Sequence, residues 1–395
     1  MAESVDIKKS LVRMRGDLEE IERERLAPFA MLSGETSGRE HDELPPLNRT
    51  HFQRDWHRIT HCQAFRKLEF KTQVFMFGEG YETVRNRLTH TLEVSQITSS
   101  VRRALGLNED LGTAIALAHD LGHPPFGHAG EDILHRLVQS LNHNVHGLRI
   151  VRTLEKRYAE FAGLNLTFET LEGLEKHDTD YDSVTYHHFF QGLMPTLEAQ
   201  VASIADAIAY RSHDVEDGLS SGVLTEAELD ASGLELWLMI RERLGDIAGP
   251  ARMSQLARHL IDIMVLDVLA ETERRLGDAG ISSVEDVRRH KGVLVGMGSE
   301  LDKANQELGR FLYENFYKDY RVARLMAKGQ EIIQRMFETF KANPALLPPD
   351  AYTRFREADE KRTGEPLRVV ADYLASLTDR QAIDEYRKLY DVGPR

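Results

Sequence analysis

The chain is dominated by stretches in which apolar residues recur every three to four positions. One stretch runs from Val84 to Leu105, and Gly106 after it supplies a stop signal. Its apolar positions are Leu88, Leu92, Val94, Ile97, Val101 and Leu105. This period places them on one face of an α-helix that packs against a core. The pattern therefore predicts a helix over residues 84–105.

Further segments with the same period follow along the chain. Asn108 is a suitable N-cap for a second helix, because Glu109 and Asp110 stand in its first turn, where the helix dipole favours acidic groups. The LGHPP segment at 121–125 breaks this helix, and its prolines can begin a third. The helices predicted up to residue 218 are 7–26, 51–68, 84–105, 108–119, 124–141, 147–161 and 196–218. Charged helical stretches with short Gly or Pro breaks continue to the C-terminus.

One segment resembles a β-strand more than any other. It is Lys71–Phe77 (KTQVFMF), and two nearby glycines end it. Residues 27–50 and 163–183 predict irregular structure, and the NPALLPP segment at 343–349 is the best candidate for a linker to a C-terminal appendage. Because sustained strand patterns are nearly absent, we predict an all-α fold.

Composition narrows the class of protein. The 395 residues are 41% hydrophobic and 29% charged, which suffices for a buried core and excludes global disorder. A formal charge of −14 argues against broad, sequence-independent coating of nucleic acid and leaves open its binding at a local basic pocket. The single cysteine, Cys62, excludes a disulfide scaffold and a thiolate-rich zinc site. Because no apolar run reaches about 18 residues and the charged N-terminus lacks a signal-peptide core, we expect a cytoplasmic protein with no membrane partner.

Histidines are concentrated in one part of the chain. Six of the 17 lie between residues 119 and 146, and Asp120 directly follows His119. A hard or borderline divalent ion prefers mixed nitrogen and oxygen ligands, and a His-Asp pair converges on one ion most easily at a helix end. His90 in an earlier helix is a further candidate ligand. Asp206 in a later helix is another, because a lone carboxylate amid apolar positions is costly without a partner.

Two features suit hydrolysis of a phosphate ester. His128 and Glu131 are three positions apart, so a helix opening at the prolines places an imidazole beside a carboxylate that can orient it or share its proton. Residues 51–90 carry seven basic and four acidic side chains, a net charge of +3 in an acidic chain. A pocket for a triphosphate needs such an excess of positive charge.

The order of His90, His119-Asp120 and a distant Asp206 resembles the HD phosphohydrolase superfamily, which is named for its His…His-Asp…Asp ligand set. The flanking text resembles, more narrowly, the dGTPase-like deoxynucleoside triphosphate triphosphohydrolases. The similar segments are RDWHRITHCQAFRKLEFKTQVF, RLTHTLEV, AIALAHDLGHPPFGHAGE, NHNVHGLRIV, ADAIAYRSHDVEDG, LYENFYKDYRVARLM and VVADYLASLTDRQAIDEYRKLYD. Together they cover roughly residues 40–391.

The resemblance implies an HD-domain helical bundle with additional C-terminal helices, and hydrolysis of a deoxynucleoside triphosphate to deoxynucleoside and inorganic triphosphate. It implies one divalent metal ion, Mn²⁺ or Mg²⁺ first, with Fe, Co, Ni or Zn as alternatives. The implied metal ligands are His90, His119, Asp120 and Asp206. The other implied site residues are His128 and Glu131 for catalysis, Arg87 and His123 at the phosphates, and Gln73, Tyr210 and Asp214 at the sugar and base.

The sequence departs from the family pattern in two places. His146 stands where a glutamine is expected, and Ala207 stands where relatives often carry a polar residue. Relatives also form oligomers with nucleotide effector sites at their interfaces. We therefore expect a homo-oligomer, based on a dimer and extending to a hexamer as an alternative, with deoxynucleoside triphosphates as substrate and as candidate effector.

Two other function classes fit the same superfamily. One is a phosphodiesterase or nucleotidase acting on cyclic or monophosphate nucleotides, and the other is a catalytically silent, nucleotide-binding regulator. The HAGE and ADAIAY segments favour the triphosphohydrolase over the first, and the intact ligand set argues against the second. The predicted organisation is an N-terminal helix and loop over 1–50, an HD catalytic core over 51–220, and a helical region over 221–395 that completes the fold and provides oligomer contacts.

Overall fold

The structure is a computed structural model, and it describes residues 12–74, 85–139, 141–177, 188–360, 366–391 and 393. Over these residues the regular structure is helical, and β pairing is confined to three isolated bridges. The prediction of an all-α fold is therefore confirmed. Among the described helices, none combines the length and the apolar character that crossing a membrane requires.

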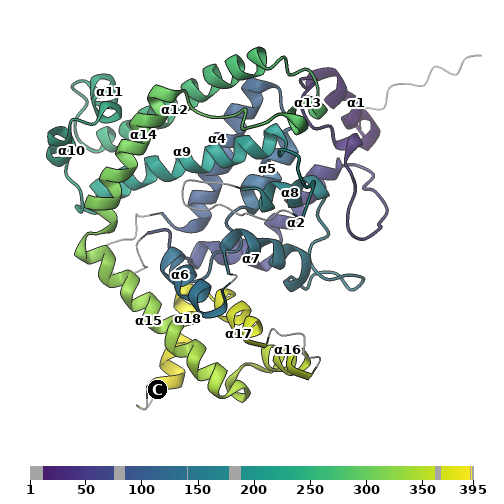
Figure 1. The fold of residues 1–395 in the computed structure, drawn as a ribbon, viewed down its shortest axis with the longest axis vertical. Coiled ribbons are helices and arrows are strands. Elements are labelled where there is room, and N and C mark those ends of the chain that lie inside the picture. The colour runs from purple at the N-terminus through teal and green to yellow at the C-terminus, as the bar shows by residue number, and fades with distance from the viewer. Residues whose placement is uncertain are drawn as a thin grey trace, which may run out of the picture.

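The helices that precede residue 221 are coloured from purple to teal in Figure 1. They are α1 (Arg15–Arg25), α2 (His51–Thr60), α3 (Gln63–Lys67), α4 (Arg87–Leu105), α5 (Glu109–Ala118), α6 (Gly127–Val138), α7 (His143–Arg149), α8 (Phe168–Glu175) and α9 (Leu197–Ser220). α4 packs against both α5 and α9, and α2 packs against α5. Their apolar faces meet in one core that includes Val94, Ile115 and Ile208.

The remaining helices extend this core and build a second one. They are α10 (Glu226–Ser232), α11 (Glu235–Leu244), α12 (Pro250–Asp278), α13 (Val284–Arg289), α14 (Ser299–Leu312), α15 (Tyr320–Ala342), α16 (Pro349–Glu360), α17 (Pro366–Ala375) and α18 (Asp379–Tyr390). α12 lies along α9, whereas α15, α17 and α18 lie beside α6 at the other end of the molecule (Figure 1). Phe126 and Ile133 of the α6 region share this second core with Phe337 of α15 and Val370 of α17.

Capping explains several helix ends that the sequence predicts. The side chain of Asn108 accepts hydrogen bonds from the backbone amides of Asp110 and Leu111 at the start of α5. α4 ends at Gly106, which adopts φ +68° in the left-handed region where glycine has no steric penalty. Both ends lie within three residues of the ends predicted from the apolar period.

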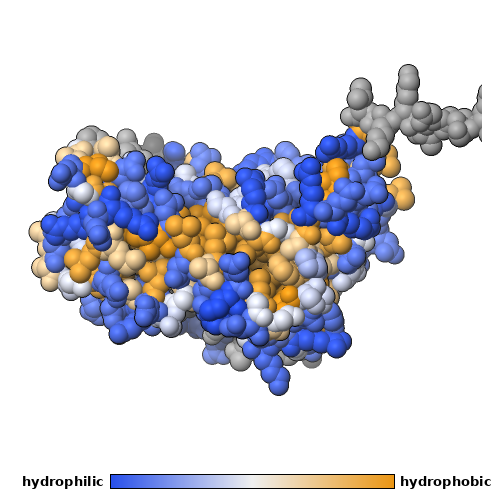
Figure 2. Space-filling model, turned by 90° about the horizontal axis from the view of Figure 1, so that it is seen from above, coloured by the Kyte–Doolittle hydropathy of each residue, from blue (hydrophilic) through white to orange (hydrophobic). Residues whose placement is uncertain are grey.

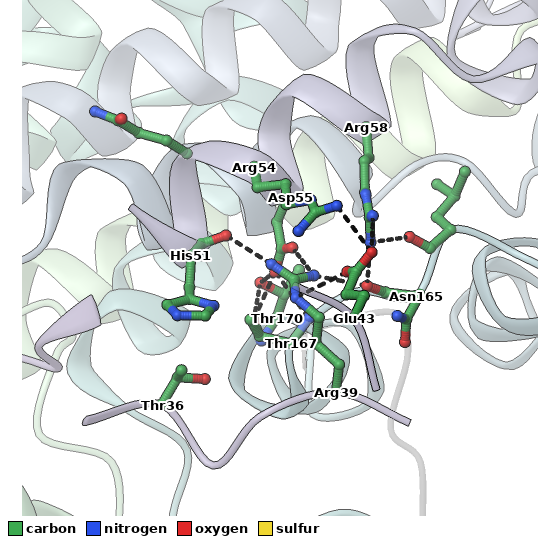
Figure 3. A network of polar contacts seen from close by, with 12 residues as sticks. Thr36, Arg39, Glu43, His51, Arg54, Asp55, Arg58, Asn165, Thr167 and Thr170 are labelled. Atoms are coloured by element: carbon green, nitrogen blue, oxygen red, sulfur yellow. Dashed lines mark hydrogen bonds and ion pairs between the residues drawn. The ribbon is translucent and has the colours of Figure 1, made fainter. Parts of the chain in front are cut away.

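A buried polar network fixes the loop before α2 against α2 and α8 (Figure 3). Asp55 is fully buried, and its carboxylate accepts hydrogen bonds from the backbone and hydroxyl of Thr167 at 2.9 and 2.6 Å and from the hydroxyl of Thr170 at 2.9 Å. Arg39 from the loop and Arg58 from α2 donate to the carbonyl oxygen of Asn165 at 2.6 and 2.7 Å. The network satisfies a buried carboxylate and so holds the N-terminus of α8 beside α2.

Three predictions about local structure are wrong. Residues 71–74 form no strand and make only one bridge, between Thr72 and Asn86, while 75–77 lie outside the described residues. The predicted helix over 147–161 ends at Leu154, because α7 passes into a π-helical turn (η3, Ile150–Leu154) and Glu155 is extended. Within 163–183, expected to be irregular, the chain forms α8.

α8 escapes prediction because its buried acidic residue Glu172 is paired with a cation that is distant in the sequence. Glu172 is fully buried, and its carboxylate accepts hydrogen bonds from Arg288 at 2.6 Å and from Lys176 at 2.7 Å. A pattern with Glu at 169, 172 and 175 indicates a solvent-exposed segment when only neighbouring residues are considered. The compensating charge comes from Arg288, more than a hundred residues later in the chain.

The first predicted helix is shorter than expected. α1 begins at Arg15, and residues 7–11 lie outside the described residues.

Seen from above, the surface of the molecule carries a broad band of apolar residues bordered by hydrophilic ones (Figure 2).

Candidate active site

Four side chains of the ligand type meet at the junction of α4, α5 and α9. His90 lies one turn into α4, His119 is the C-cap of α5, Asp120 follows it, and Asp206 lies in the first half of α9. Nε2 of His90 lies 2.9 Å from Oδ1 of Asp206, and Nε2 of His119 lies 3.6 Å from that same oxygen. Nε2 of His119 and Oδ1 of Asp120 are also 3.6 Å apart. The structure thus brings together all four residues that the sequence singles out as ligands.

The donor set fits a divalent cation. His90, His119 and Asp120 each offer one ligand atom within 4.8 Å of the others. Nδ1 of His119 donates a hydrogen bond to the carbonyl oxygen of Ala116 at 2.7 Å, which leaves the lone pair on Nε2. That Nε2 atom is buried and has no hydrogen-bond partner among the described residues. An imidazole oriented by a backbone carbonyl and facing carboxylates through its free nitrogen is typical of a metal ligand.

Electrostatics keep His119, Asp120 and Asp206 in the ionisation states that bind metal. At His90 burial opposes protonation, but the hydrogen bond and the charge of Asp206 outweigh it and raise the pKa of the imidazole. Burial lowers the pKa of His119 and so favours the neutral imidazole. Burial opposes ionisation of Asp120, but the charge of Arg87 and the neighbouring histidines outweigh it and hold the pKa of Asp120 well below its usual range. Burial likewise opposes ionisation of Asp206, but His119, His177 and His90 outweigh it and hold the pKa of Asp206 well below its usual range.

Arg87 supplies positive charge beside the candidate ligands. It is only 1% exposed, and its Nη1 donates to Oδ2 of Asp120 at 2.9 Å. Its Nε and Nη2 atoms are buried and lack hydrogen-bond partners within the described part of the chain. Unused guanidinium donors at this position match the fork geometry of a phosphate.

His128 and Glu131 form a second group in the first turns of α6. Nδ1 of His128 lies 3.4 Å from Oε2 of Glu131, as their three-residue spacing predicts. Glu131 is central to the group, because His143 contacts its Oε1 through Nδ1 at 3.0 Å and His123 contacts its Oε2 through Nδ1 at 3.6 Å. Burial alone would raise the pKa of Glu131, but His143, His123 and His128 around it hold that pKa well below the usual range.

Two glycines allow these segments to approach so closely. A Cβ atom on Gly122 would lie 1.8 Å from the carbonyl oxygen of His143, and a Cβ atom on Gly130 would lie 2.0 Å from that of Pro125. Any side chain at either position would push α7 or the start of α6 away. The LGHPPFGHAGE segment therefore needs these glycines to place Glu131 beside His143.

His123 connects the two groups. Its Nε2 lies 3.1 Å from Oδ1 of Asp120, and its ring stacks on that of His143 with 4.0 Å between the centroids. Burial and the charge of Arg87 hold the pKa of His123 well below its usual value, so the ring is neutral. The sequence prediction of a pocket position for His123 is consistent with this contact.

A cavity of about 550 Å³ opens beside His128 and Glu131. Tyr210 and Tyr317 line it, and Gln73 lines a smaller recess next to His128 and Tyr317. The hydroxyl of Tyr317 lies 2.5 Å from the hydroxyl of Tyr210 and donates to Oδ2 of Asp214 at 2.7 Å. Asp206, Tyr210 and Asp214 are four residues apart in α9, so they follow one face of the helix from the candidate metal ligands into the cavity.

Comparison with known proteins identifies the family to which this chain belongs. The HD domain matches residues 87–211, and the phosphohydrolase-associated domain matches residues 295–388. A deoxyguanosinetriphosphate triphosphohydrolase-like protein of Azoarcus sp. (strain BH72) is 46% identical over 377 residues, which are 93% of this chain and 97% of the relative. A protein of the same name from Geobacter sulfurreducens is 42% identical over 385 residues, with 95% and 97% coverage. The chain belongs to the dGTPase-like family of HD-domain phosphohydrolases.

Membership in this family confirms the resemblance seen in the sequence, and it supports a hydrolase that acts on phosphate compounds and binds a divalent metal. A hypothetical protein from Aquifex aeolicus of known crystal structure aligns over 83% of this chain and 82% of its own, with 18% identity and a TM-score of 0.30. The individual roles of the site residues in this dGTPase-like chain stay predictions.

Sequence reasoning missed three residues that border the site. Nε2 of His177 lies 3.1 Å from Oδ2 of Asp206, and Nδ1 of His213 lies 3.1 Å from Nδ1 of His90. The hydroxyl of Tyr317 contacts Tyr210 and Asp214, two of the three residues predicted at the sugar and base. A usable signal existed for His213, which lies seven positions after Asp206 and so on the same helix face, whereas His177 follows α8, a helix that was not predicted.

Proposed function

We propose that this chain hydrolyses deoxynucleoside triphosphates to deoxynucleoside and inorganic triphosphate, by attack of water on the α-phosphate. The observation that carries the proposal is the convergence of His90, His119, Asp120 and Asp206 beside the unpaired donors of Arg87 and the His128–Glu131 pair. The printed name of the relatives, deoxyguanosinetriphosphate triphosphohydrolase-like protein, supports the same reaction.

The four ligand residues would hold one divalent ion, Mn²⁺ or Mg²⁺ first. When bound, such an ion neutralises charge on phosphate oxygens and lowers the pKa of a coordinated water. Arg87 would add its Nε and Nη2 donors to the phosphate oxygens, because these atoms have no other partner in the described chain. His123, between Asp120 and Glu131, would lie along the phosphates.

His128 and Glu131 would handle the proton. The carboxylate of Glu131 faces Nδ1 of His128, so Nε2 of the same ring is left for the reacting groups in the cavity. In the reaction a bond forms between the water oxygen and the α-phosphorus, the bond from phosphorus to the 5′-oxygen breaks, and a proton ends on that oxygen. The pair thereby orients the water and assists departure of the deoxynucleoside.

Gln73, Tyr210 and Asp214 would bind the sugar and base. Tyr210 lines the cavity, and Asp214 lies behind it with Tyr317 between the two side chains. A tyrosine ring offers a flat apolar face to a sugar, and a buried carboxyl offers oxygens to a hydroxyl. Cytoplasmic location, a homo-oligomeric state and a nucleotide effector accompany this proposal as predictions.

The test is a product assay with each of the four deoxynucleoside triphosphates, alone and in mixtures, in the presence of Mn²⁺ or Mg²⁺. We expect inorganic triphosphate and deoxynucleoside in equal amounts, detected by ³¹P NMR and chromatography. Formation of pyrophosphate and a monophosphate, or turnover of cyclic or monophosphate nucleotides alone, would move the chain to another HD phosphohydrolase class. Absence of all turnover would favour a nucleotide-binding regulator.

A further inference from the structure

A line of polar side chains leads from the candidate ligand His90 towards the surface. Nδ1 of its ring lies 3.1 Å from Nδ1 of His213, and Nε2 of His213 contacts Oε2 of Glu93. Glu93 comes three residues after His90 on α4 and so lies on the same face of that helix. His213 lies on the face of α9 that carries Asp206, and α4 packs against α9. The function proposed above assigns no task to Glu93 or His213.

Burial makes the position of each ring proton depend on the partner of that nitrogen. His90 and His213 are 1% and 2% exposed, and Glu93 is half-buried at the outer end of the line. A buried N–H group or lone pair that lacks a partner costs free energy. The contacts between these three side chains therefore determine which nitrogen of each imidazole carries a proton.

Only one arrangement of protons satisfies the line. A carboxylate accepts and cannot donate, so the proton of His213 lies on Nε2, towards Glu93. Burial disfavours a charged ring and lowers the pKa of His213 to about 4, so Nδ1 of that ring carries no second proton. Nδ1 of His213 therefore accepts a hydrogen bond, and the N–H at Nδ1 of His90 donates it.

This arrangement leaves the other nitrogen of His90 for a metal ion. Nε2 of His90 lies 2.9 Å from Oδ1 of Asp206, on the side where the four candidate ligands meet. A metal-ligating imidazole usually donates its second N–H to a carboxylate, a carbonyl or a water, which fixes the orientation of the ring and raises its basicity. Here an imidazole, that of His213, accepts from the ligand and passes the contact on to Glu93.

Arg85 holds the outer end of the line. Its Nε donates to both carboxylate oxygens of Glu93 at 3.1 Å, and its Nη1 donates to Oδ1 of Asp217 at 3.0 Å. Burial would raise the pKa of Glu93, but His213 and Arg85 outweigh it and lower that pKa to about 2. Glu93 is therefore ionised, and its position relative to α9 is fixed by an arginine that bonds both helices.

We propose that His213 is a positioning residue for the candidate metal ligand His90, and that Glu93 in turn orients His213. The inference rests on the proposed function in one respect, that His90 binds a divalent ion. Because Glu93 acts through His213, removal of either side chain should weaken binding of the ion. Removal of both should weaken it no further than removal of His213 alone.

The test measures binding of Mn²⁺ to the full-length, EDTA-treated protein through the paramagnetic resonance signal of free Mn²⁺, which requires no turnover. The variants are His213→Ala, His213→Asn, Glu93→Ala and the double variant with alanine at both positions. Glu216→Ala is the matched control. Glu216 also accepts from Arg85, at 2.5 Å, but makes no hydrogen bond or ion pair with His213 among the described residues.

We expect His213→Ala to bind Mn²⁺ about 10- to 100-fold more weakly, the usual effect of removing the partner of a metal-ligating histidine. His213→Asn should recover part of this loss, because its amide oxygen can accept from Nδ1 of His90. Glu93→Ala should lose about threefold or more. The double variant should match His213→Ala within about twofold, because the two side chains act in one line. The control should bind Mn²⁺ like the natural chain.

Natural affinity in His213→Ala, or losses in the two single variants that multiply in the double variant, would overturn the proposal. No recovery in His213→Asn would also contradict it. Melting curves check that each variant is folded. If the His213 variants are unstable, the comparison of Glu93→Ala with Glu216→Ala decides, since both positions are half-buried, and equal affinities would reject the proposal.

Failure of this inference differs from failure of the proposed function. A chain that hydrolyses no deoxynucleotide but shows the expected order of Mn²⁺ affinities would contradict the proposed function and leave the role of His213 standing. A chain that hydrolyses deoxynucleoside triphosphates, and whose His213→Ala variant keeps its natural Mn²⁺ affinity, would do the reverse.

Discussion

Side chains that carry charge or titrate form one continuous line of contacts through the candidate active site. Oδ1 of Asp120 lies 3.1 Å from His123, whose other nitrogen lies 3.6 Å from Glu131, and Glu131 lies 3.4 Å from His128. At the other end, Asp120 meets His119. The contacts run from the candidate ligands His119 and Asp120 to the partly exposed imidazole of His128. We assign metal binding and proton transfer to different residues of this line, so a substitution can remove one function and leave the other.

Replacing His128 tests the proton-transfer role. We expect His128→Ala to keep its metal, because His128 is outside the four candidate ligands, and to lose about 10²- to 10⁴-fold in turnover, the usual contribution of a positioned acid or base. Arg136→Ala is the matched control, since Arg136 is exposed on the same helix and does not line the cavity. Metal analysis and steady-state rates check both variants. A His128 variant with natural turnover would contradict the role assigned to this residue.

Asp214 makes the stability of the protein depend on pH. Burial raises the pKa of this carboxyl to about 7, against the hydrogen bond from Tyr317 and the charge of Arg211, which lower it. Between about pH 4 and 7 the folded state therefore holds a proton that the unfolded state releases, so stability falls as pH rises through this window. The loss is at most about 4 kcal/mol, from about 1.4 kcal/mol per pKa unit.

Asp214→Asn should remove that loss. The amide cannot ionise, so we expect the variant to gain stability relative to the natural chain at pH 8 and not at pH 4.5. Urea unfolding at the two pH values measures the difference, and Asp262→Asn, at a half-exposed position on α12, is the control. The same stability difference at both pH values would show that ionisation of Asp214 is not its cause.

At the scale of elements, the start of α6 is held by a residue from the far end of the chain. Asp379, the first residue of α18, is buried and accepts hydrogen bonds from the backbone amides of Phe126 and Thr72, both at 2.9 Å. Phe126 is the N-cap of α6 and adopts φ +65°, an uncommon conformation for a residue other than glycine. α18 therefore fixes the turn that aims His128 and Glu131.

Removing this carboxylate should disturb catalysis without removing metal. Asp379→Ala leaves buried amides unsatisfied, which costs at least about 2 kcal/mol of stability. We expect lower turnover with unchanged metal content, and partial recovery in Asp379→Asn, whose amide oxygen can still accept. Asp384→Ala, half-exposed on the same helix, should resemble the natural chain. Loss of metal together with activity in Asp379→Ala would indicate general disruption instead.

Over the whole molecule, the elements that could be predicted from the sequence are those whose stabilising contacts lie between residues close together in the chain. The helices over 84–105, 108–119 and 196–218 were predictable, because caps and apolar period are encoded in neighbouring residues. The strand predicted over 71–77 is wrong for residues 71–74. This part has the composition of a strand, yet it pairs at one bridge with Asn86 and is held by Asp379. No neighbouring residue indicates that second contact.

The candidate ligands were predictable from spacing and flanking text, whereas their neighbours were not. His177 and His213 reach Asp206 and His90 only after α8 and α9 have packed beside α4 and α5. A cavity of about 600 Å³ is lined by residues of α3, α16 and α17. Because α3 lies about three hundred residues before the other two helices, the sequence does not show that these residues line one cavity. Contacts between residues so far apart in the sequence depend on tertiary packing, which cannot be predicted from one sequence alone.

Metal analysis of the purified chain, together with single substitutions of His90, His119, Asp120 and Asp206, tests the central claim most directly. The account predicts about one divalent ion per chain in the natural protein, a strong loss of metal in each of the four variants, and retention of the metal in the Arg136→Ala control. Four variants that all keep their metal, or a natural chain that binds no divalent ion under saturating Mn²⁺ or Mg²⁺, would contradict it.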